Sequence, residues 1–488
     1  MKKLLFTLVF YVFLFPSFII AQDAGKDISI GKSYTLKSEI LGEERPFSVY
    51  LPIDYSPNGK PIPVIYLLDG DYHFHHTTGV VHFLSTQGRM PAMMVVAVPN
   101  TTDRTRDLTP EILKDEQAKK NFPTGGHANK MLSFIKDELI PHIDKNYHTS
   151  PYKTLIGHSF GGIFAVNAFL EEPDLFDSYI SISPSMWWDD QSLVDKAEKM
   201  LKEKPEIEVY FYMTMGNEGG SMLGGAMKLA ALFEEYEYEG FEWDFKVMEE
   251  ETHGSVPHRS TYYGLEKIFK SWFSADVAEI YQKGGMEAVE KHYGKISKKL
   301  GYPWEISETD LNDLGYQLMR RNKLAEAKEV FARNIKEHPK SYNTYDSMGE
   351  AYMANKENEK AIENYKKSLA IHPGNANAVQ MLQKLGEEYD VMSQKLELSP
   401  NKLKAYTGKY KTRMGVVEVS LEEGKLMAEV KGGFPKTEML PFPNKVFFMK
   451  PLNAALQFKM DENKEVKGFT AQQGIGQRME GEKISEME

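Results

Sequence analysis

The fold of this chain is decided by the stretch Leu155-Ile-Gly-His-Ser-Phe-Gly-Gly162. An apolar run from Thr154 to Ile156 leads into it, and an apolar, helix-compatible segment from Ile163 to Leu170 follows. Strand, sharp turn and helix in that order are the context of a G-x-S-x-G turn, where small residues flank a serine. The serine hydroxyl then projects above a helix N-terminus, which favours developing negative charge. We therefore predict that Ser159 is a nucleophile and that the backbone N–H of Phe160 is one oxyanion donor.

The length, charge and cysteine content of the chain limit its number of domains, its partners and its chemistry. The chain has 488 residues, which suggests about three domains. Its net charge is −11, so a nucleic-acid partner is not expected. Cysteine is absent, which excludes disulfides, thiol nucleophiles and cysteine-ligated metals.

The first 21 residues have the pattern of a secretory signal peptide. Two lysines precede an apolar run from Leu4 to Ile20, and Ala21 is followed by polar residues. We expect cleavage after Ala21 and a periplasmic or secreted protein. The alternative is an uncleaved anchor, because the run is long for a signal core, but Pro16 interrupts it. No later stretch is apolar enough to span a bilayer, so the mature protein is not expected to cross a membrane.

Residues 22–275 alternate between apolar strand patterns and helical periodicity. Short apolar runs bounded by turn residues suit parallel strands buried on both faces. Alternation at this spacing predicts an α/β domain with a parallel sheet that starts from an antiparallel pair. The expected strands are 33–41, 44–51, 63–68, 94–98, 154–156, 178–182, 208–213 and 242–248. The expected helices are 127–140, 163–170, 191–203 and 262–272.

Residues 276–395 are predicted to be helical and contain an internal repeat. The matched pairs, each 34 residues apart, are Leu314 with Met348, Ala327 with Ala361, Phe331 with Tyr365, and Pro339 with Pro373. That period is typical of tetratricopeptide repeats, which we place at 308–341 and 342–375 with a capping helix at 376–386. Two repeats are few to stand alone, so we expect them to pack on the helical stretch 277–300 or on the preceding domain. A protein partner is possible on these repeats.

After residue 396 the apolar pattern changes to period two. Val417, Val419 and Leu421 alternate with polar residues before a turn at Glu423-Gly424, and the alternation then resumes. Six to eight short antiparallel strands predict a small β-barrel or sandwich over 396–488.

A serine nucleophile needs a general base and usually a carboxylate that orients it. The acid and the histidine are expected after late strands, in that order along the chain. His253 follows the last predicted strand, and Glu218 follows the preceding one. The alternatives are a surface-loop histidine for His253 and a solvated loop carboxylate for Glu218. Asp244 and residues 249–251 are competing acids.

The loop Leu68-Asp-Gly-Asp71 is the candidate source of a second oxyanion donor. We choose the amide of Asp71, with that of Gly70 next, because the glycine lets the backbone turn toward the nucleophile. His73, His75 and His76 follow, and they can be interpreted as a metal cluster. Without a carboxylate or cysteine partner at ligand spacing, a polar pocket wall is favoured. No metal and no organic cofactor are predicted.

Four further residues are candidates for substrate binding. Arg104 and Arg106 sit where a strand ends, which is where ligands of open α/β sheets bind. They suit an anionic or catecholic substrate, and the alternative is structural ion pairs. Trp187 and Trp188 are either a pocket wall or plain core.

These stretches together resemble the putative-esterase family of α/β-hydrolases, which includes enterochelin esterases, S-formylglutathione hydrolases and feruloyl esterases. The matching pieces are Tyr66 to Asp71, Asn100 to Pro110, Gly157 to Gly162, Ser183 to Trp188, and His253 to Val256. The resemblance implies Ser159 as nucleophile, His253 as base, and the amides of Phe160 and Asp71 as the oxyanion hole. The third catalytic member varies in the family, so Glu218 stays open. The tail from Leu403 to Tyr410 looks like the start of a small β-domain appended to bacterial hydrolases.

The expected function is therefore that of an exported serine esterase that acts on a small-molecule ester. A siderophore lactone is the leading substrate, and feruloyl or acetyl esters of plant polysaccharide come second. The competing class is a non-enzymatic adaptor in which the repeats bind a partner.

Overall fold

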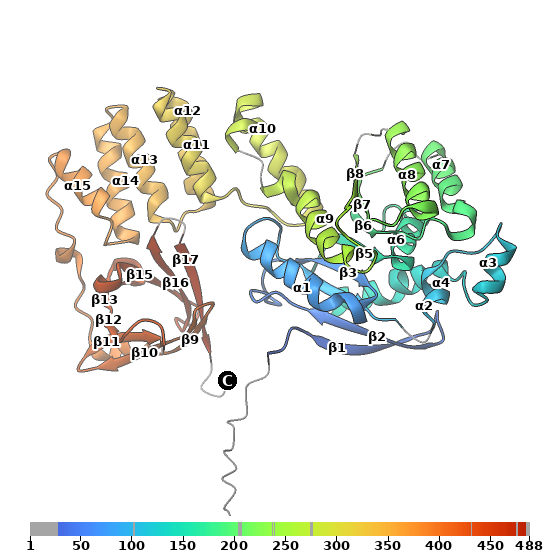
Figure 1. Cartoon of the computed structure of the whole chain (residues 1–488). Helices are drawn as coiled ribbons and strands as arrows, with labels where there is room; N and C mark the ends of the chain where they lie inside the picture. Colours follow the sequence, from blue (N-terminus) through green and yellow to red (C-terminus); the bar gives the residue numbers. More distant parts are fainter. Residues whose placement is uncertain are drawn as a thin grey trace, which may run out of the picture.

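The computed structural model describes residues 28–484, apart from 101–102, 204–206, 237, 239, 274–276, 431 and 475–476. The predicted signal peptide lies outside the described residues. Within the described part of the chain, no helix is both long and apolar enough to cross a bilayer. A mixed sheet with its helices, a row of helices and an antiparallel sheet follow one another along the chain (Figure 1).

The first part is built on an eight-stranded sheet of order β1-β2-β4-β3-β5-β6-β7-β8. β1 pairs antiparallel with β2 and β2 with β4, while every pair from β4 to β8 is parallel. This is the α/β arrangement predicted from the alternating pattern. The strands are β1 (Lys32–Ser38), β2 (Glu43–Tyr50), β3 (Ile62–Leu68), β4 (Met94–Val98), β5 (Thr149–His158), β6 (Ser178–Ile182), β7 (Val209–Met215) and β8 (Phe241–Val247).

Helices cover both faces of this sheet and bury two apolar layers. One layer includes α4, α6, α7 and α8, and the other includes α1 and α9. The predicted helix 127–140 is α4 and α5 joined by a π-helical turn over Ile135–Leu139. The helices are α1 (Gly70–Thr86), α2 (Arg104–Leu108), α3 (Glu116–Asn121), α4 (Ala128–Phe134), α5 (Ile140–Asn146), α6 (Phe160–Glu171), α7 (Ser192–Glu203), α8 (Gly220–Glu235) and α9 (Val256–Phe273).

The second part is a row of helices that runs from the α/β domain toward the C-terminal sheet (Figure 1). Two helix pairs pack alike, because Gly315 lies against the ring of Phe331 and Gly349 lies against the ring of Tyr365. Small residues at these crossings let the helices of a pair approach closely. The helices are α10 (Val277–Leu300), α11 (Glu308–Arg320), α12 (Leu324–Glu337), α13 (Tyr342–Ala354), α14 (Asn358–Ile371) and α15 (Ala376–Lys384).

One apolar layer of the α/β domain continues into these helices. It includes Tyr152 and Phe269 of the first part, Val289 of α10, and Leu311 and Phe331 of the first helix pair. The prediction that the repeats pack on residues 277–300 agrees with this packing. The predicted boundary between residues 275 and 276 therefore divides a continuous core.

The third part is an antiparallel sheet of order β12-β11-β10-β9-β17-β16-β15-β14-β13. Its two end strands are separated along the chain by Met439 alone, so the sheet curls into a nearly closed barrel. The described part of this sheet has nine strands where six to eight were expected, and two of them, β12 and β13, are very short. The strands are β9 (Gly408–Thr412), β10 (Gly415–Glu422), β11 (Lys425–Val430), β12 (Thr437–Glu438), β13 (Leu440–Phe442), β14 (Val446–Met449), β15 (Ala454–Met460), β16 (Val466–Gly474) and β17 (Gln477–Ile484).

Candidate active site

Ser159 occupies a strained turn between β5 and α6. Its backbone has φ 61° and ψ −113°, a region that residues with a side chain rarely adopt. A side chain at Gly157 would meet the carbonyl oxygen of Gly161 at 2.0 Å, and one at Gly162 would meet that of Ile182 at 2.8 Å. The glycines thus permit the sharp turn, which presents the Ser159 hydroxyl at the carboxyl edge of the sheet, as the sequence predicts.

His253 and Glu218 come from the loops after β8 and β7 and form a pair. The Nδ1 atom of His253 lies 2.7 Å from Oε1 of Glu218. The side chain of Glu218 is 9% exposed, whereas that of His253 is 41% exposed. A backbone hydrogen bond of 2.7 Å from the N–H of Asn217 to the carbonyl of Glu251 ties the two loops together.

The competing carboxylates have other partners. Asp244 forms an ion pair with Lys267 at 2.6 Å, and Glu251 forms one with Arg259 at 2.9 Å. Of the acids considered from the sequence, Glu218 is the one that the structure places on His253.

His253 lies beside the turn that carries Ser159, since its ring centroid is 4.5 Å from that of His158, the residue before Ser159. With Nδ1 on Glu218, the Nε2 atom is the nitrogen left for a nucleophile. The Ser159 hydroxyl itself lies 3.3 Å from the hydroxyl of Ser185. Sequence reasoning did not select Ser185, although it follows β6, the neighbour of β5, at the same sheet edge.

The two predicted oxyanion donors come from the first turns of two helices. Phe160 is the first residue of α6, and Gly70 and Asp71 are the first two residues of α1. In α1 the first backbone hydrogen bonds run from the N–H groups of Tyr72 and His73 to the carbonyl of Asp69. The earlier amides of a helix have no intrahelical partner. A side chain at Gly161 would come within 2.9 Å of the Asp69 carboxylate, so the two helix starts are in contact.

Arg104 joins these two segments. Its Nη2 atom donates to Oδ2 of Asp69 at 2.9 Å and to the carbonyl of His158 at 3.1 Å. Its guanidinium also lies 5.3 Å from the ring centroid of Phe160. Arg104 therefore forms an internal ion pair, which was the alternative to substrate binding. Its partners, Asp69 and the carbonyl of His158, belong to the two segments that carry the predicted oxyanion donors.

Arg106 is held in an ion-pair cluster. It contacts Glu43 and Asp107, each at 2.7 Å, and Asp107 also pairs with the buried Arg45. Hydrogen bonding from Arg106 is the main cause that lowers the pKa of Glu43. The ion-pair alternative describes Arg106 as well.

The two predicted aromatic wall residues differ in burial. Trp188 is 1% exposed, and its indole N–H donates to the carbonyl of Pro110 at 2.9 Å, so it takes the core alternative. Trp187 is half-buried, with its ring 6.0 Å from that of Phe160 and 6.0 Å from that of Phe122. Phe122, Phe160 and Trp187 thus form an aromatic cluster next to the turn that carries Ser159.

Three histidine side chains that are mostly buried lie next to one another near the Ser159 turn. Burial is the main cause that lowers the pKa of His158 to about 3 and that of His76 to about 4, so both are neutral near pH 7. His73 links them, with Nδ1 3.0 Å from Nε2 of His76 and its ring 5.3 Å from that of His158. Among the described residues, no three metal-ligating side chains converge on one point.

Comparison with known proteins shows which proteins the first domain is similar to. Residues 38–262 match the family model described as putative esterase. These residues, which make up most of the α/β domain, are therefore similar to the putative esterase family. Over 171 residues, this chain is 30% identical to the ferri-bacillibactin esterase BesA of Bacillus subtilis, covering 32% of this chain and 59% of that one. It is also 30% identical over 164 residues to a siderophore enterobactin esterase of Emericella nidulans, covering 30% of this chain and 53% of that one. The chain thus spans a little more than half the length of these two relatives.

Solved structures agree with the fold of the α/β domain. An IroE-like serine hydrolase from Shewanella oneidensis matches with a TM-score of 0.52 at 27% identity, over 62% of this chain and 98% of that one. An uncharacterised protein from Capnocytophaga ochracea matches with a TM-score of 0.58 at 18% identity, over 69% of this chain and 93% of that one. The latter likeness concerns the fold alone.

Proposed function

We propose that this protein is an exported serine esterase that uses Ser159, His253 and Glu218. The observation that carries the proposal is the 2.7 Å contact between His253 and Glu218 at the sheet edge where Ser159 occupies its turn. A carboxylate on Nδ1 fixes the tautomer in which Nε2 can accept the serine proton.

The reaction follows from this arrangement. After the Ser159 hydroxyl turns from Ser185 toward His253, its oxygen attacks the ester carbonyl while Nε2 of His253 takes the proton. The amides of Phe160 and Asp71 receive the oxyanion, and Glu218 stabilises the imidazolium. The imidazolium then protonates the departing alcohol. Water activated by the same histidine hydrolyses the acyl-enzyme, which restores Ser159.

A siderophore lactone or a similar ester is the substrate we favour. Two relatives at 30% identity carry siderophore esterase names, and the S. oneidensis structure is an IroE-like serine hydrolase. Feruloyl or acetyl esters of plant polysaccharide remain the second candidate, and the aromatic cluster of Phe122, Phe160 and Trp187 beside Ser159 favours a feruloyl group. We also propose that the helical repeats bind a protein partner. In the alternative, a non-enzymatic adaptor, this binding would be the protein's only function.

The test is a hydrolysis series with the full chain and with Ser159→Ala. We expect turnover of a catecholate trilactone to exceed that of feruloyl and butyryl esters. Ser159→Ala should lower every rate by roughly four to six orders of magnitude, as loss of a nucleophile does. Faster feruloyl turnover would favour the polysaccharide candidate. A Ser159→Ala protein that retains a tenth of the activity would contradict the serine mechanism.

A further inference from the structure

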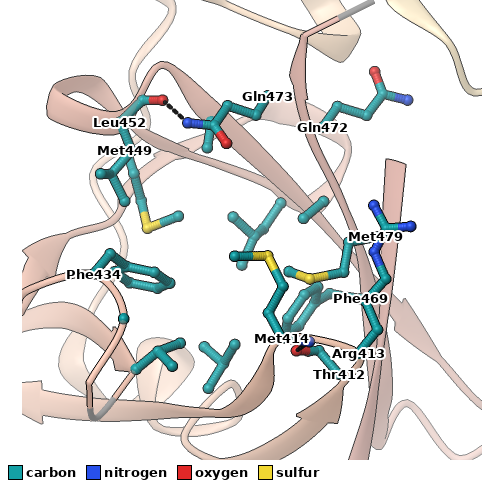
Figure 2. Close-up of a pocket in the computed structure, with 16 residues that line it drawn as sticks. Thr412, Arg413, Met414, Phe434, Met449, Leu452, Phe469, Gln472, Gln473 and Met479 are labelled. Atoms are coloured by element: carbon teal, nitrogen blue, oxygen red, sulfur yellow. Dashed lines mark hydrogen bonds between the residues drawn. The ribbon is translucent and has the colours of Figure 1, made fainter. Parts of the chain in front are cut away.

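The C-terminal barrel encloses a pocket that the esterase proposal does not use. Its volume is about 480 Å³, within the range of roughly 300–1,000 Å³ typical of small-molecule sites. Strands β10, β15 and β16 each contribute lining residues, and Figure 2 shows the lining side chains around the space. Well-packed interiors contain few voids larger than a water molecule, so a space of this size is not a packing defect.

The pocket wall is mainly apolar. Val417, Leu456 and Phe469 are buried there, and Figure 2 shows the ring of Phe434 on the opposite side. Three methionines, Met414, Met449 and Met479, point their thioethers toward the space (Figure 2). Methionine side chains adapt to irregular apolar shapes, which suits a flexible chain more than a rigid polar ligand.

The three uncharged polar side chains of the wall each donate a hydrogen bond within the protein. Gln473 donates to the carbonyl of Leu452 at 3.0 Å, and Gln472 donates to the carbonyl of Lys340 in the helical part. The Thr412 hydroxyl donates to the carbonyl of Gly415 at 2.7 Å. The mainly apolar interior thus offers few partners to a ligand rich in hydroxyls, and burying unpaired hydroxyls is costly.

One charged group stands at the edge of the pocket. Arg413 is exposed, and within the described part of the chain no carboxylate forms an ion pair with it. Its neighbour Met414 is 68% exposed, which marks the open end of the pocket. An apolar interior with a cation at its opening matches a molecule with an apolar chain and an anionic head.

We propose that the barrel binds a medium-chain fatty acid. The acyl chain occupies the space among Met449, Phe434 and Phe469, and its carboxylate pairs with Arg413 at the opening. This site belongs to a different part of the chain from Ser159, so it stands independently of the esterase proposal.

The test is calorimetric titration of the full-length protein with dodecanoate and with dodecanol. We expect saturable binding of one dodecanoate, and weaker binding of dodecanol, which has the chain without the charge. Arg413→Gln should weaken dodecanoate binding by about threefold to tenfold and leave dodecanol binding unchanged. Lys411→Gln removes an exposed cation of β9, the strand just before the turn that carries Arg413; Lys411 does not line the pocket, and its replacement should change neither binding constant.

Two further variants test the location. Ala471→Phe fills the space and should lower dodecanoate affinity at least tenfold, whereas Val416→Phe, whose side chain does not line the pocket, should not. Met414→Glu places a negative charge at the exposed opening without disturbing the core, so it reports even if Ala471→Phe does not fold. It should weaken dodecanoate binding more than dodecanol binding.

The proposal is overturned if neither ligand binds the wild-type protein. Equal affinity for dodecanoate and dodecanol, or an Arg413→Gln effect common to both, would remove the carboxylate assignment. Unchanged dodecanoate binding in both Ala471→Phe and Met414→Glu would place the ligand elsewhere. Ester hydrolysis, measured in parallel, should be the same in all these variants, so failure of either proposal is seen separately.

Discussion

Oε1 of Glu218 lies 2.7 Å from Nδ1 of His253, although the two residues are 35 positions apart and belong to loops that follow different strands. The other carboxylate oxygen of Glu218 is buried without a hydrogen-bond partner, so the interaction with His253 is the one that the side chain makes among the described residues. A nearly buried carboxylate aimed at a histidine in this way fixes the orientation of the imidazole.

Glu218→Gln should lower kcat/KM for any ester by a factor between about 10 and 10⁴, because the amide cannot stabilise the imidazolium. Glu250→Gln, an exposed carboxylate of the neighbouring loop, is the matched control and should leave the rate unchanged. Steady-state hydrolysis of a butyryl ester measures both. An unchanged rate in Glu218→Gln would show that the enzyme works with a serine–histidine pair or with another acid.

The sequence predicted the α/β strands because each is an apolar run closed by turn residues. It also predicted Ser159, whose turn requires glycines at fixed spacing. The acid was ambiguous, because Glu218, Asp244 and residues 249–251 all follow late strands. Only the fold shows that Asp244 and Glu251 are engaged by Lys267 and Arg259.

The roles of the arginines and of Ser185 depend on contacts that a linear pattern does not encode. Asp69 is 31 positions from Asn100 and 35 from Arg104, yet its carboxylate gathers both side chains. The two tryptophans are adjacent in the chain but differ in burial, because Trp188 turns inward to the carbonyl of Pro110.

Arg104→Gln tests whether this arginine holds the oxyanion segments or binds substrate. The change removes the link between Asp69 and His158 and leaves a buried carboxylate without its cation. We expect kcat to fall by about 10- to 100-fold on neutral and anionic esters alike, since small misplacements of catalytic groups are costly. A rise in KM confined to anionic esters would instead support the substrate-binding role predicted from the sequence.

Stability should fall in mild acid because of His158. Its folded pKa is about 3, mainly through burial, whereas an unfolded histidine titrates near 6.5. The unfolded state therefore binds more protons between these values, and the stability of the neutral form, complete above pH 6.5, is lost as pH falls toward 3. From pH 7.5 to 5.0 this amounts to about 2 kcal/mol.

The variant His158→Asn removes this titration. The difference in unfolding free energy between pH 7.5 and 5.0, measured with urea, should shrink by about 2 kcal/mol. His82→Asn, which changes an exposed histidine of α1, is the control and should keep the wild-type difference. The same pH dependence in His158→Asn and wild type would contradict the assignment.

The continuous core predicts that the α/β domain needs helix α10. Val289 and Ile296 of α10 belong to the same apolar layer as Tyr152 and Phe269. Each buried aliphatic side chain contributes about 1.5–3 kcal/mol, and a whole domain is stable by only about 5–15 kcal/mol.

A fragment of residues 22–305 should therefore unfold cooperatively and hydrolyse a butyryl ester, whereas one of residues 22–275 should not fold stably. Thermal unfolding followed by circular dichroism distinguishes them. Equal Tm values for the two fragments would show that the α/β domain folds without α10 and ends at residue 275, as the sequence predicts.

The most direct measurement of the central claim is the mass of the intact protein after reaction with a fluorophosphonate. The Ser159 oxygen should displace fluoride from phosphorus and form one covalent adduct, located on the Ser159 peptide by fragmentation. The account predicts no adduct in Ser159→Ala and a strongly slowed reaction in His253→Ala. An active wild-type protein that forms no adduct, or forms it on another residue, would contradict the account.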